Sequence, residues 1–157
     1  MKIFYAFLLL CLPHLLWAQD ETAPELTASF FAIIVEDMDT SLLWYKEKLG
    51  FRILTETNLP DRALRQANLQ KDHVHLELIE LASALKPAEA IADFSPKSKI
   101  TGFFKVGFRV PDFESWLTHL DKVKIDWQGK VVKDPLSRKR MLIITDPDGN
   151  RLQFFES

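Results

Sequence analysis

The stretch VEDMDTSLLWYKEKLGF, residues 35–51, is the part of the chain that decides the fold. It follows an apolar segment, residues 30–35, that reads as a strand, and Asp37 is a residue type that commonly caps helices. Met38, Leu42, Tyr45 and Leu49 are spaced as on one face of a helix, and a glycine follows at position 50 as a suitable helix stop. The stretch therefore predicts a strand that leads directly into an amphipathic helix.

A second copy of this pattern begins at Lys105, with the sequence KVGFRVPDFESWLTHL. Val35-x-Asp37 aligns with Val110-x-Asp112 at an offset of 75 residues, and HLELIE (75–80) matches RLQFFE (151–156) at an offset of 76. Two distant segments thus give nearly the same offset, which predicts a duplicated unit about 75 residues long.

Each unit is predicted to continue with three strands. These strands are expected near 51–57, 62–70 and 73–80 in the first unit, and near 124–132, 138–145 and 150–156 in the second. DPDGN, residues 146–150, is a turn signal, and a proline-containing linker, residues 82–101, has a short helical piece near 87–91. The prediction is an α+β domain of two tandem βαβββ modules, about 29–81 and about 102–157.

The N-terminus has a different character. Residues 1–18 contain one lysine and an apolar run that ends in LWA, which predicts a secretory signal peptide, followed by a linker, residues 19–28. A retained membrane anchor is the alternative, although the run is short for a span. Cleavage would remove Cys11, the only cysteine, and with it any thiol chemistry or disulfide. We expect a secreted or periplasmic protein without a stable membrane anchor.

The composition of the chain limits the kinds of molecule that it is expected to bind. The formal net charge is −2 and no block of like charge occurs, so nothing favours binding to nucleic acid. Apolar residues make up 47% of the chain, which is typical of a globular protein.

Alternation along the first and last strand of each unit predicts two different sheet faces. One parity is almost purely apolar and should lie under the helix: Phe31, Ile33, Val35, Val74, Leu76, Leu78, Phe104, Val106, Phe108, Val110, Leu152 and Phe154. The opposite parity is mixed: Phe30, Ala32, Ile34, His73, His75, Glu77, Lys105, Gly107, Arg109, Arg151, Gln153 and Phe155. A mixed face that recurs in both units predicts a lined cleft.

The duplicated strand–helix–three-strand module, with VEDMDTSLLWYKEKLGF early and DPDGNRLQFFE at the end, resembles the vicinal-oxygen-chelate (VOC) superfamily. This superfamily contains glyoxalases, bleomycin resistance proteins and extradiol dioxygenases, and the resemblance covers about residues 29–157. It implies one cupped, eight-stranded mixed sheet around a cleft. Because members include several enzyme classes and plain drug-binding proteins, the resemblance alone does not fix the function.

The resemblance implies metal-ligand positions at Phe30, Glu77, Lys105 and Gln153. Only Glu77 fits cleanly, because Phe30 has no lone pair and the Lys105 ammonium would repel a cation. We therefore expect a metal-free site in which Lys105 and Glu77 form an ion pair, near Gln153 and an apolar wall from Phe30. Whether that pair binds a ligand or is purely structural is left open.

His73 and His75 offer a different reading. With Glu77 they recur at every second residue, although all three cannot easily reach one ion on a strand. A divalent-metal site of His75, Glu77 and Gln153 is the alternative, and polar side chains that line a wet cleft are the simpler interpretation.

Ligand binding is the leading functional hypothesis. Lys105, Arg109 and Arg151 supply cations and Phe30 and Phe155 supply apolar surface, which suits a small molecule with an apolar body and an acidic or polar group. The remaining candidate ligand-binding residues are His75, Glu77 and Gln153. No catalytic residue is predicted, since a neighbouring lysine would oppose Glu77 as a base.

Two other hypotheses differ in class. One is a metal-dependent, glyoxalase-like lyase or dioxygenase that uses Glu77, and the other is a partner-binding protein with a vestigial cleft. A homodimer is left open.

Overall fold

The computed structural model describes residues 26–95 and 100–157. The predicted signal peptide, residues 1–18, lies outside the described residues. Module one contains β1 (Phe31–Val35), α1 (Met38–Leu49), β2 (Arg52–Leu59), a 3₁₀ turn η1 (Pro60–Arg62), β3 (Leu64–Lys71) and β4 (Val74–Leu81). Module two contains β5 (Val106–Val110), α3 (Phe113–Lys122), β6 (Val132–Lys133), β7 (Arg140–Thr145) and β8 (Arg151–Glu156). The short helix α2 (Pro87–Ala90) lies in the linker, where a helical piece was predicted.

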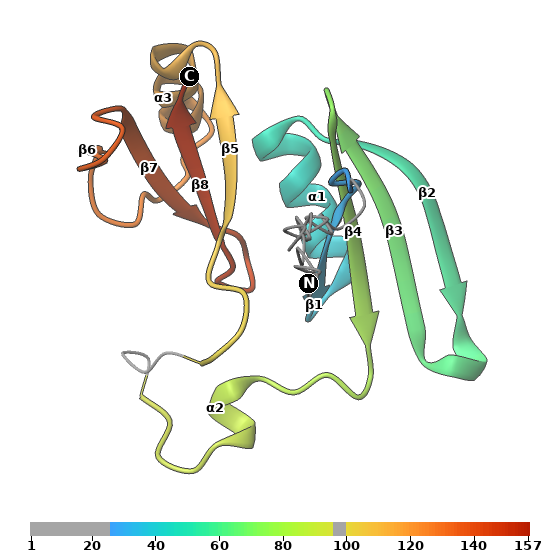
Figure 1. Ribbon diagram of the computed structural model, residues 1–157. Helices are drawn as coiled ribbons and strands as arrows, with labels where there is room; N and C mark the ends of the chain where they lie inside the picture. Colours follow the sequence, from blue (N-terminus) through green and yellow to red (C-terminus); the bar gives the residue numbers. More distant parts are fainter. Residues whose placement is uncertain (1–25, 96–99) are drawn as a thin grey trace, which may run out of the picture.

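The eight strands form two four-stranded mixed sheets (Figure 1). Sheet one has the order β1-β4-β3-β2 and sheet two the order β5-β8-β7-β6, so the two modules repeat one topology. In each sheet the first strand pairs in parallel with the last, and the other pairs are antiparallel. The duplicated α+β architecture predicted from the sequence is confirmed. The eight strands form two separately hydrogen-bonded sheets in place of the single eight-stranded sheet that the resemblance implied.

Helix α1 begins and ends where the local sequence predicts. The Asp37 side chain accepts a hydrogen bond from the Thr40 backbone N–H at 2.7 Å, which caps the first turn. Gly50 ends the helix in the left-handed region, with φ of 72°, and its N–H bonds to the Lys46 carbonyl. Helix α3 repeats the start with Asp112, whose side chain accepts from the Ser115 N–H.

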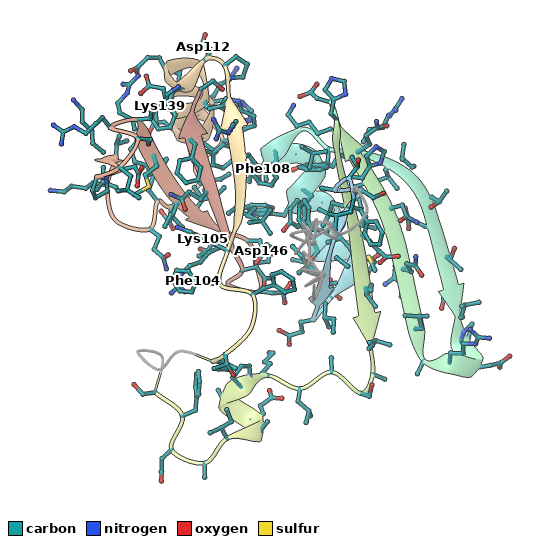
Figure 2. The ribbon with its side chains drawn as sticks, viewed as in Figure 1. Phe104, Lys105, Phe108, Asp112, Lys139 and Asp146 are labelled. Atoms are coloured by element: carbon teal, nitrogen blue, oxygen red, sulfur yellow. The ribbon has the colours of Figure 1, made fainter. Side chains whose placement is uncertain are left out.

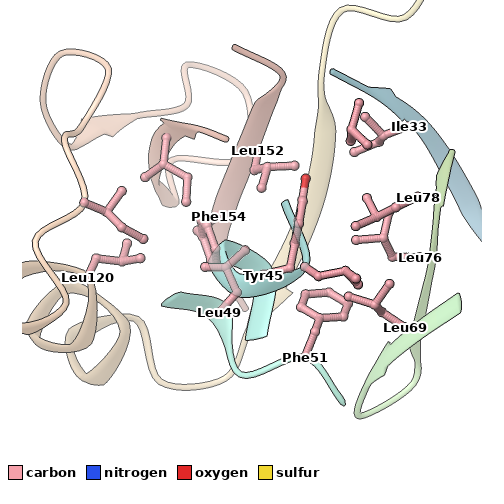
Figure 3. Packing of buried hydrophobic residues seen from close by; sticks show 14 of the residues in the cluster. Ile33, Tyr45, Leu49, Phe51, Leu69, Leu76, Leu78, Leu120, Leu152 and Phe154 are labelled. Carbon is pink, nitrogen blue, oxygen red and sulfur yellow. The ribbon is translucent and has the colours of Figure 1, made fainter. Parts of the chain in front are cut away.

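One core serves both modules. The apolar parity of the strands is buried under the helices, and Tyr45 of α1 packs between the apolar residues of β4 and those of β8 (Figure 3). Phe31 of β1 and Phe108 of β5 also meet, with ring centroids 5.9 Å apart. Because the same cluster contains residues from both sheets, the modules stabilise each other.

Hydrogen bonds complete the contact between the modules. The Tyr45 hydroxyl donates to buried Asp146 at 2.9 Å, and the Ser41 hydroxyl donates to Asp148 at 3.3 Å. Lys48 donates to the Val123 carbonyl at 2.6 Å. The turn DPDGN therefore holds α1 of the other module as well as reversing the chain.

One predicted strand is wrong. Residues 124–131 contain only an isolated bridge, from Trp127 to Ile144, and strand β6 is limited to Val132–Lys133. Lys124 and Gly129 both have positive φ, at 55° and 90°, which interrupts an extended conformation. Within the two described ranges, no helix is both long and apolar enough to cross a membrane.

Candidate functional site

Each sheet has an open face, by which we mean the face turned away from its helix. The parity prediction holds for most residues of the covered face, including Val35, Leu78 and Leu152, which are buried. Phe104 is the exception, because it precedes β5 and its side chain is 54% exposed. The open face of sheet one carries Glu77 and His75, and the open face of sheet two carries Arg151, Gln153 and Phe155.

Glu77 lies mid-strand on β4, between Ala32 of β1 and Asn68 of β3. Its carboxylate accepts a hydrogen bond from the Gln66 side-chain amide of β3. The predicted ion pair with Lys105 is wrong: among the described residues, no ion pair includes Glu77. The amide of Gln66, which the sequence reading missed, satisfies the carboxylate instead.

The two histidines do not act together. His73 lies in the turn before β4 and is exposed, so the interpretation that places it on the strand is wrong. His75 is on β4 and exposed, opposite Gln70 of β3, and the nearest side-chain nitrogens are 3.5 Å apart. His75 is therefore a solvated side chain beside an amide.

Gln153 is the buried polar residue of the open face of sheet two. It is 0% exposed, and its Nε2 donates to the Met141 sulfur at 2.6 Å. Among the residues that the structure describes, its Oε1 has no hydrogen-bond partner, although the atom is buried. A buried carbonyl oxygen without a donor costs stability, which distinguishes Gln153 from the other polar residues of this face.

Gly107 and Phe155 shape the surroundings of Gln153. Gly107 is opposite Gln153 in the β5–β8 register, and Phe155 follows two residues later on the same face. A Cβ built at Gly107 would lie 3.3 Å from the Phe155 ring. Because Gly107 has no side chain, the Phe155 ring has room to lie close to the backbone at that position.

Two of the predicted cations gather around one aromatic ring. The Arg151 guanidinium lies 4.7 Å from the Phe104 ring centroid, and the Lys105 Nζ lies 5.9 Å from it. Arg151 also donates to the Gln128 side chain at 2.9 Å. Figure 2 shows Phe104 and Lys105 together where the chain enters β5. The sequence reading placed Phe104 under the helix and so missed this aromatic–cation cluster.

The other two predicted ligand-binding residues lie apart from this cluster. Arg109 is exposed near the end of β5 and lines a pocket between the modules with Lys71 and Trp116. Phe30 precedes β1 and is 62% exposed. Within the described ranges, no hydrogen bond or ion pair joins either residue to Glu77 or Gln153.

The donor atoms present do not fit a divalent metal. Of the four positions implied by the resemblance, Phe30 has no donor and Lys105 is a cation beside a ring. Within residues 26–95 and 100–157, no three His, Cys, Asp or Glu side chains are grouped so as to hold a metal ion.

Comparison with known proteins agrees with the duplicated topology. Residues 27–154 match the family model of the Glyoxalase/Bleomycin resistance protein/Dioxygenase superfamily. The chain is 28% identical over 125 residues to the uncharacterized protein YwkD of Bacillus subtilis (strain 168), which covers 80% of this chain and 92% of YwkD. The uncharacterized protein YaeR of Escherichia coli (strain K12) matches with the same identity and coverage.

Solved structures show the same fold. The crystal structure of SMU.1112c has a TM-score of 0.69 at 27% identity and covers 84% of this chain and 100% of that chain. A glyoxalase family protein from Enterococcus faecalis has a TM-score of 0.69 at 22% identity, with 83% of this chain and 97% of that chain covered. From the fold, the paired modules and the match over residues 27–154, the chain belongs to the Glyoxalase/Bleomycin resistance protein/Dioxygenase superfamily.

Proposed function

We propose that this chain is an exported, metal-free member of the superfamily that binds a small aromatic or acidic molecule on the open face of sheet two. The observation that carries the proposal is the buried, unpaired Oε1 of Gln153 on the face that also holds Arg151. An unpaired acceptor favours a ligand with a hydroxyl or amino group, because such a group can donate the missing hydrogen bond.

The neighbouring cations define the rest of the ligand. Lys105 and Arg151 flank Phe104, and no ion pair among the described residues includes either cation. A carboxylate would receive charge-assisted hydrogen bonds from them, while an aromatic body would pack on Phe104 or Phe155. The ligand class is therefore an aromatic acid with a hydrogen-bond donor on its ring.

The test uses 4-hydroxybenzoate as the probe, titrated into residues 19–157 and followed by NMR. We expect Arg151→Gln and Lys105→Gln each to weaken binding about threefold to tenfold, as for loss of one charge-assisted contact. Gln153→Leu should weaken 4-hydroxybenzoate more than benzoate, because only the former donates to Oε1. Lys46→Gln, an exposed cation on α1, is the control and should leave binding unchanged.

Equal affinity of the wild type and the two cation variants for the probe would overturn the assignment of this face. The metal-dependent alternative, a lyase or dioxygenase that uses Glu77, is tested separately by elemental analysis of protein purified without chelator. Stoichiometric metal that is lost in Glu77→Gln would favour this alternative over the metal-free proposal.

Export is supported by the apolar N-terminal run and the LWA sequence at residues 16–18. The expected result is a secreted or periplasmic protein whose mass lacks residues 1–18, measured by intact mass spectrometry. Recovery of the full-length chain with the membrane fraction would favour a retained anchor instead.

A further inference from the structure

The two modules meet at two related junctions, and among the described residues hydrogen bonds close only the first of them. The offset of 75 that aligns the modules pairs Ser41 with Trp116, so both helices present this position to the other module. At the first junction Ser41 donates to Asp148, in the turn between β7 and β8. At the second, Trp116 meets the turn between β3 and β4 through Lys71, whose Nζ lies 5.7 Å from the indole centroid.

The second junction contains a pocket of about 100 Å³, which we call the junction pocket. Buried Phe51 and Phe154 contribute to its lining, and half-buried Phe108 and Trp116 add two further aromatic surfaces. Aromatic side chains thus come from both modules. Such a lining favours a flat apolar ligand.

Charged side chains complete the lining of the junction pocket. Among the described lining residues, Lys71 and Arg109 are the cations and Asp72 is the one acid, which gives these residues a net charge of +1. Within residues 26–95 and 100–157, no ion pair includes Lys71 or Arg109. Two cations without acidic partners beside an aromatic lining are complementary to an anion.

From this arrangement we infer that the junction pocket is a second small-molecule site, which takes an aromatic carboxylate of a single ring. The ring would lie against Trp116 and Phe108, and the carboxylate would lie near Lys71, whose Nζ is 5.7 Å from the indole centroid. The junction pocket is smaller than the apolar cavity of about 150 Å³ that holds benzene, and it is open to solvent, so part of the ring and the carboxylate would lie at its rim. This site is independent of the proposed site on the open face, because Lys105, Arg151 and Gln153 do not line it.

The experiment titrates benzoate into residues 19–157 and follows the complex by NMR, with benzyl alcohol as the neutral analogue of similar size. We expect Lys71→Gln to weaken benzoate binding about threefold to tenfold, as for loss of one charge-assisted contact. Asp72→Asn should strengthen binding, because it removes the acid that the described part of the lining contains. Lys46→Gln, an exposed cation on α1, is the control and should leave the binding of benzoate at the junction pocket unchanged.

Three results would overturn the inference. The first is benzoate affinity that is unchanged by both Lys71→Gln and Asp72→Asn in proteins that melt cooperatively. The second is benzyl alcohol binding as tightly as benzoate. The third is binding that is lost in Lys105→Gln and retained in Lys71→Gln, which would assign benzoate to the open face and leave only the proposed function standing.

Discussion

Tyr45 shows how much one buried side chain contributes to this fold. It is 0% exposed, and its hydroxyl donates to Asp146 across the boundary between the modules. Burial, followed by the nearby Asp146 carboxylate, raises the pKa of Tyr45 well above the ordinary value of 10.0. Burial also raises the pKa of Asp146, so the hydroxyl and the carboxyl form a hydrogen-bonded pair shielded from water.

The raised pKa of Tyr45 predicts a loss of stability at alkaline pH. An acid whose folded-state pKa is raised contributes stability that is present below pH 10.0 and is lost as the pH rises above it, because only the unfolded chain then ionises. Tyr45 is the only tyrosine in residues 19–157, so tyrosinate absorbance reports on it alone. We expect no tyrosinate until the protein unfolds, and a titration near pH 10 in folded protein would contradict this.

Tyr45→Phe tests the hydrogen bond itself. The variant should be destabilised by about 1–3 kcal/mol near neutral pH, since a buried hydrogen bond to a charged group is lost. The difference from wild type should shrink above pH 10, because phenylalanine cannot ionise. Denaturant unfolding at neutral and alkaline pH measures both effects. A difference in stability between wild type and Tyr45→Phe that grows with pH would contradict the predicted direction of the pH effect.

Glu156 predicts the opposite response, at acidic pH. Hydrogen bonds from Arg140, whose Nη2 lies 2.7 Å from Oε1, lower the pKa of Glu156 to about 2. A lowered pKa gives stability that is present above the ordinary value of 4.5 and is lost as the pH falls toward about 2. We expect the melting temperature of Glu156→Gln to change less with pH between these two values than that of the wild type. Glu47→Gln is the control and should follow the wild type. The same slope in all three proteins would contradict the assignment.

At the scale of single elements, local signals predict helices well here because caps and stops act within one turn. Asp37 and Gly50 fix both ends of α1, and alternation assigns most strand residues to the correct face. The prediction of a strand at 124–132 was wrong because Lys124 and Gly129 adopt positive φ, which an alternation of polar and apolar residues does not reveal. The predicted surroundings of Glu77 and Phe104 were wrong for a related reason. They depend on strand register and on the path of the chain, which composition does not specify.

Gly50 offers the sharpest test at this scale. Its φ of 72° is left-handed, and a Cβ there would lie 3.4 Å from the Lys71 Nζ, an ordinary contact. Backbone strain therefore decides the outcome, and Gly50→Ala should destabilise the protein by about 1 kcal/mol. Gly50→Asn is the matched variant and should lose less, because asparagine tolerates this conformation better. Equal losses, measured by denaturant unfolding, would point to a cause other than φ.

At the scale of the whole molecule, the core is not divided between the modules. Tyr45 contacts Asp146, Phe31 contacts Phe108, and Lys48 bonds to the Val123 carbonyl, so each half completes the other. Each module is also near the size at which a single core is marginal, since small domains bury a low fraction of their surface. Neither half should therefore fold alone, although the sequence is duplicated.

This expectation can be tested by cutting the chain where it is exposed. Residues 82–93 of the linker are exposed, so a protease site engineered at Ala84–Leu85 should be cleaved in the folded protein. The two pieces should still elute together at the size of the intact chain and melt in one transition, because the shared core outweighs the broken peptide bond. Residues 26–95 expressed alone, in contrast, should show no cooperative transition. If the cleaved halves separate under native conditions and each melts cooperatively, the modules are independent domains, and the junction pocket could not persist in a cleaved protein.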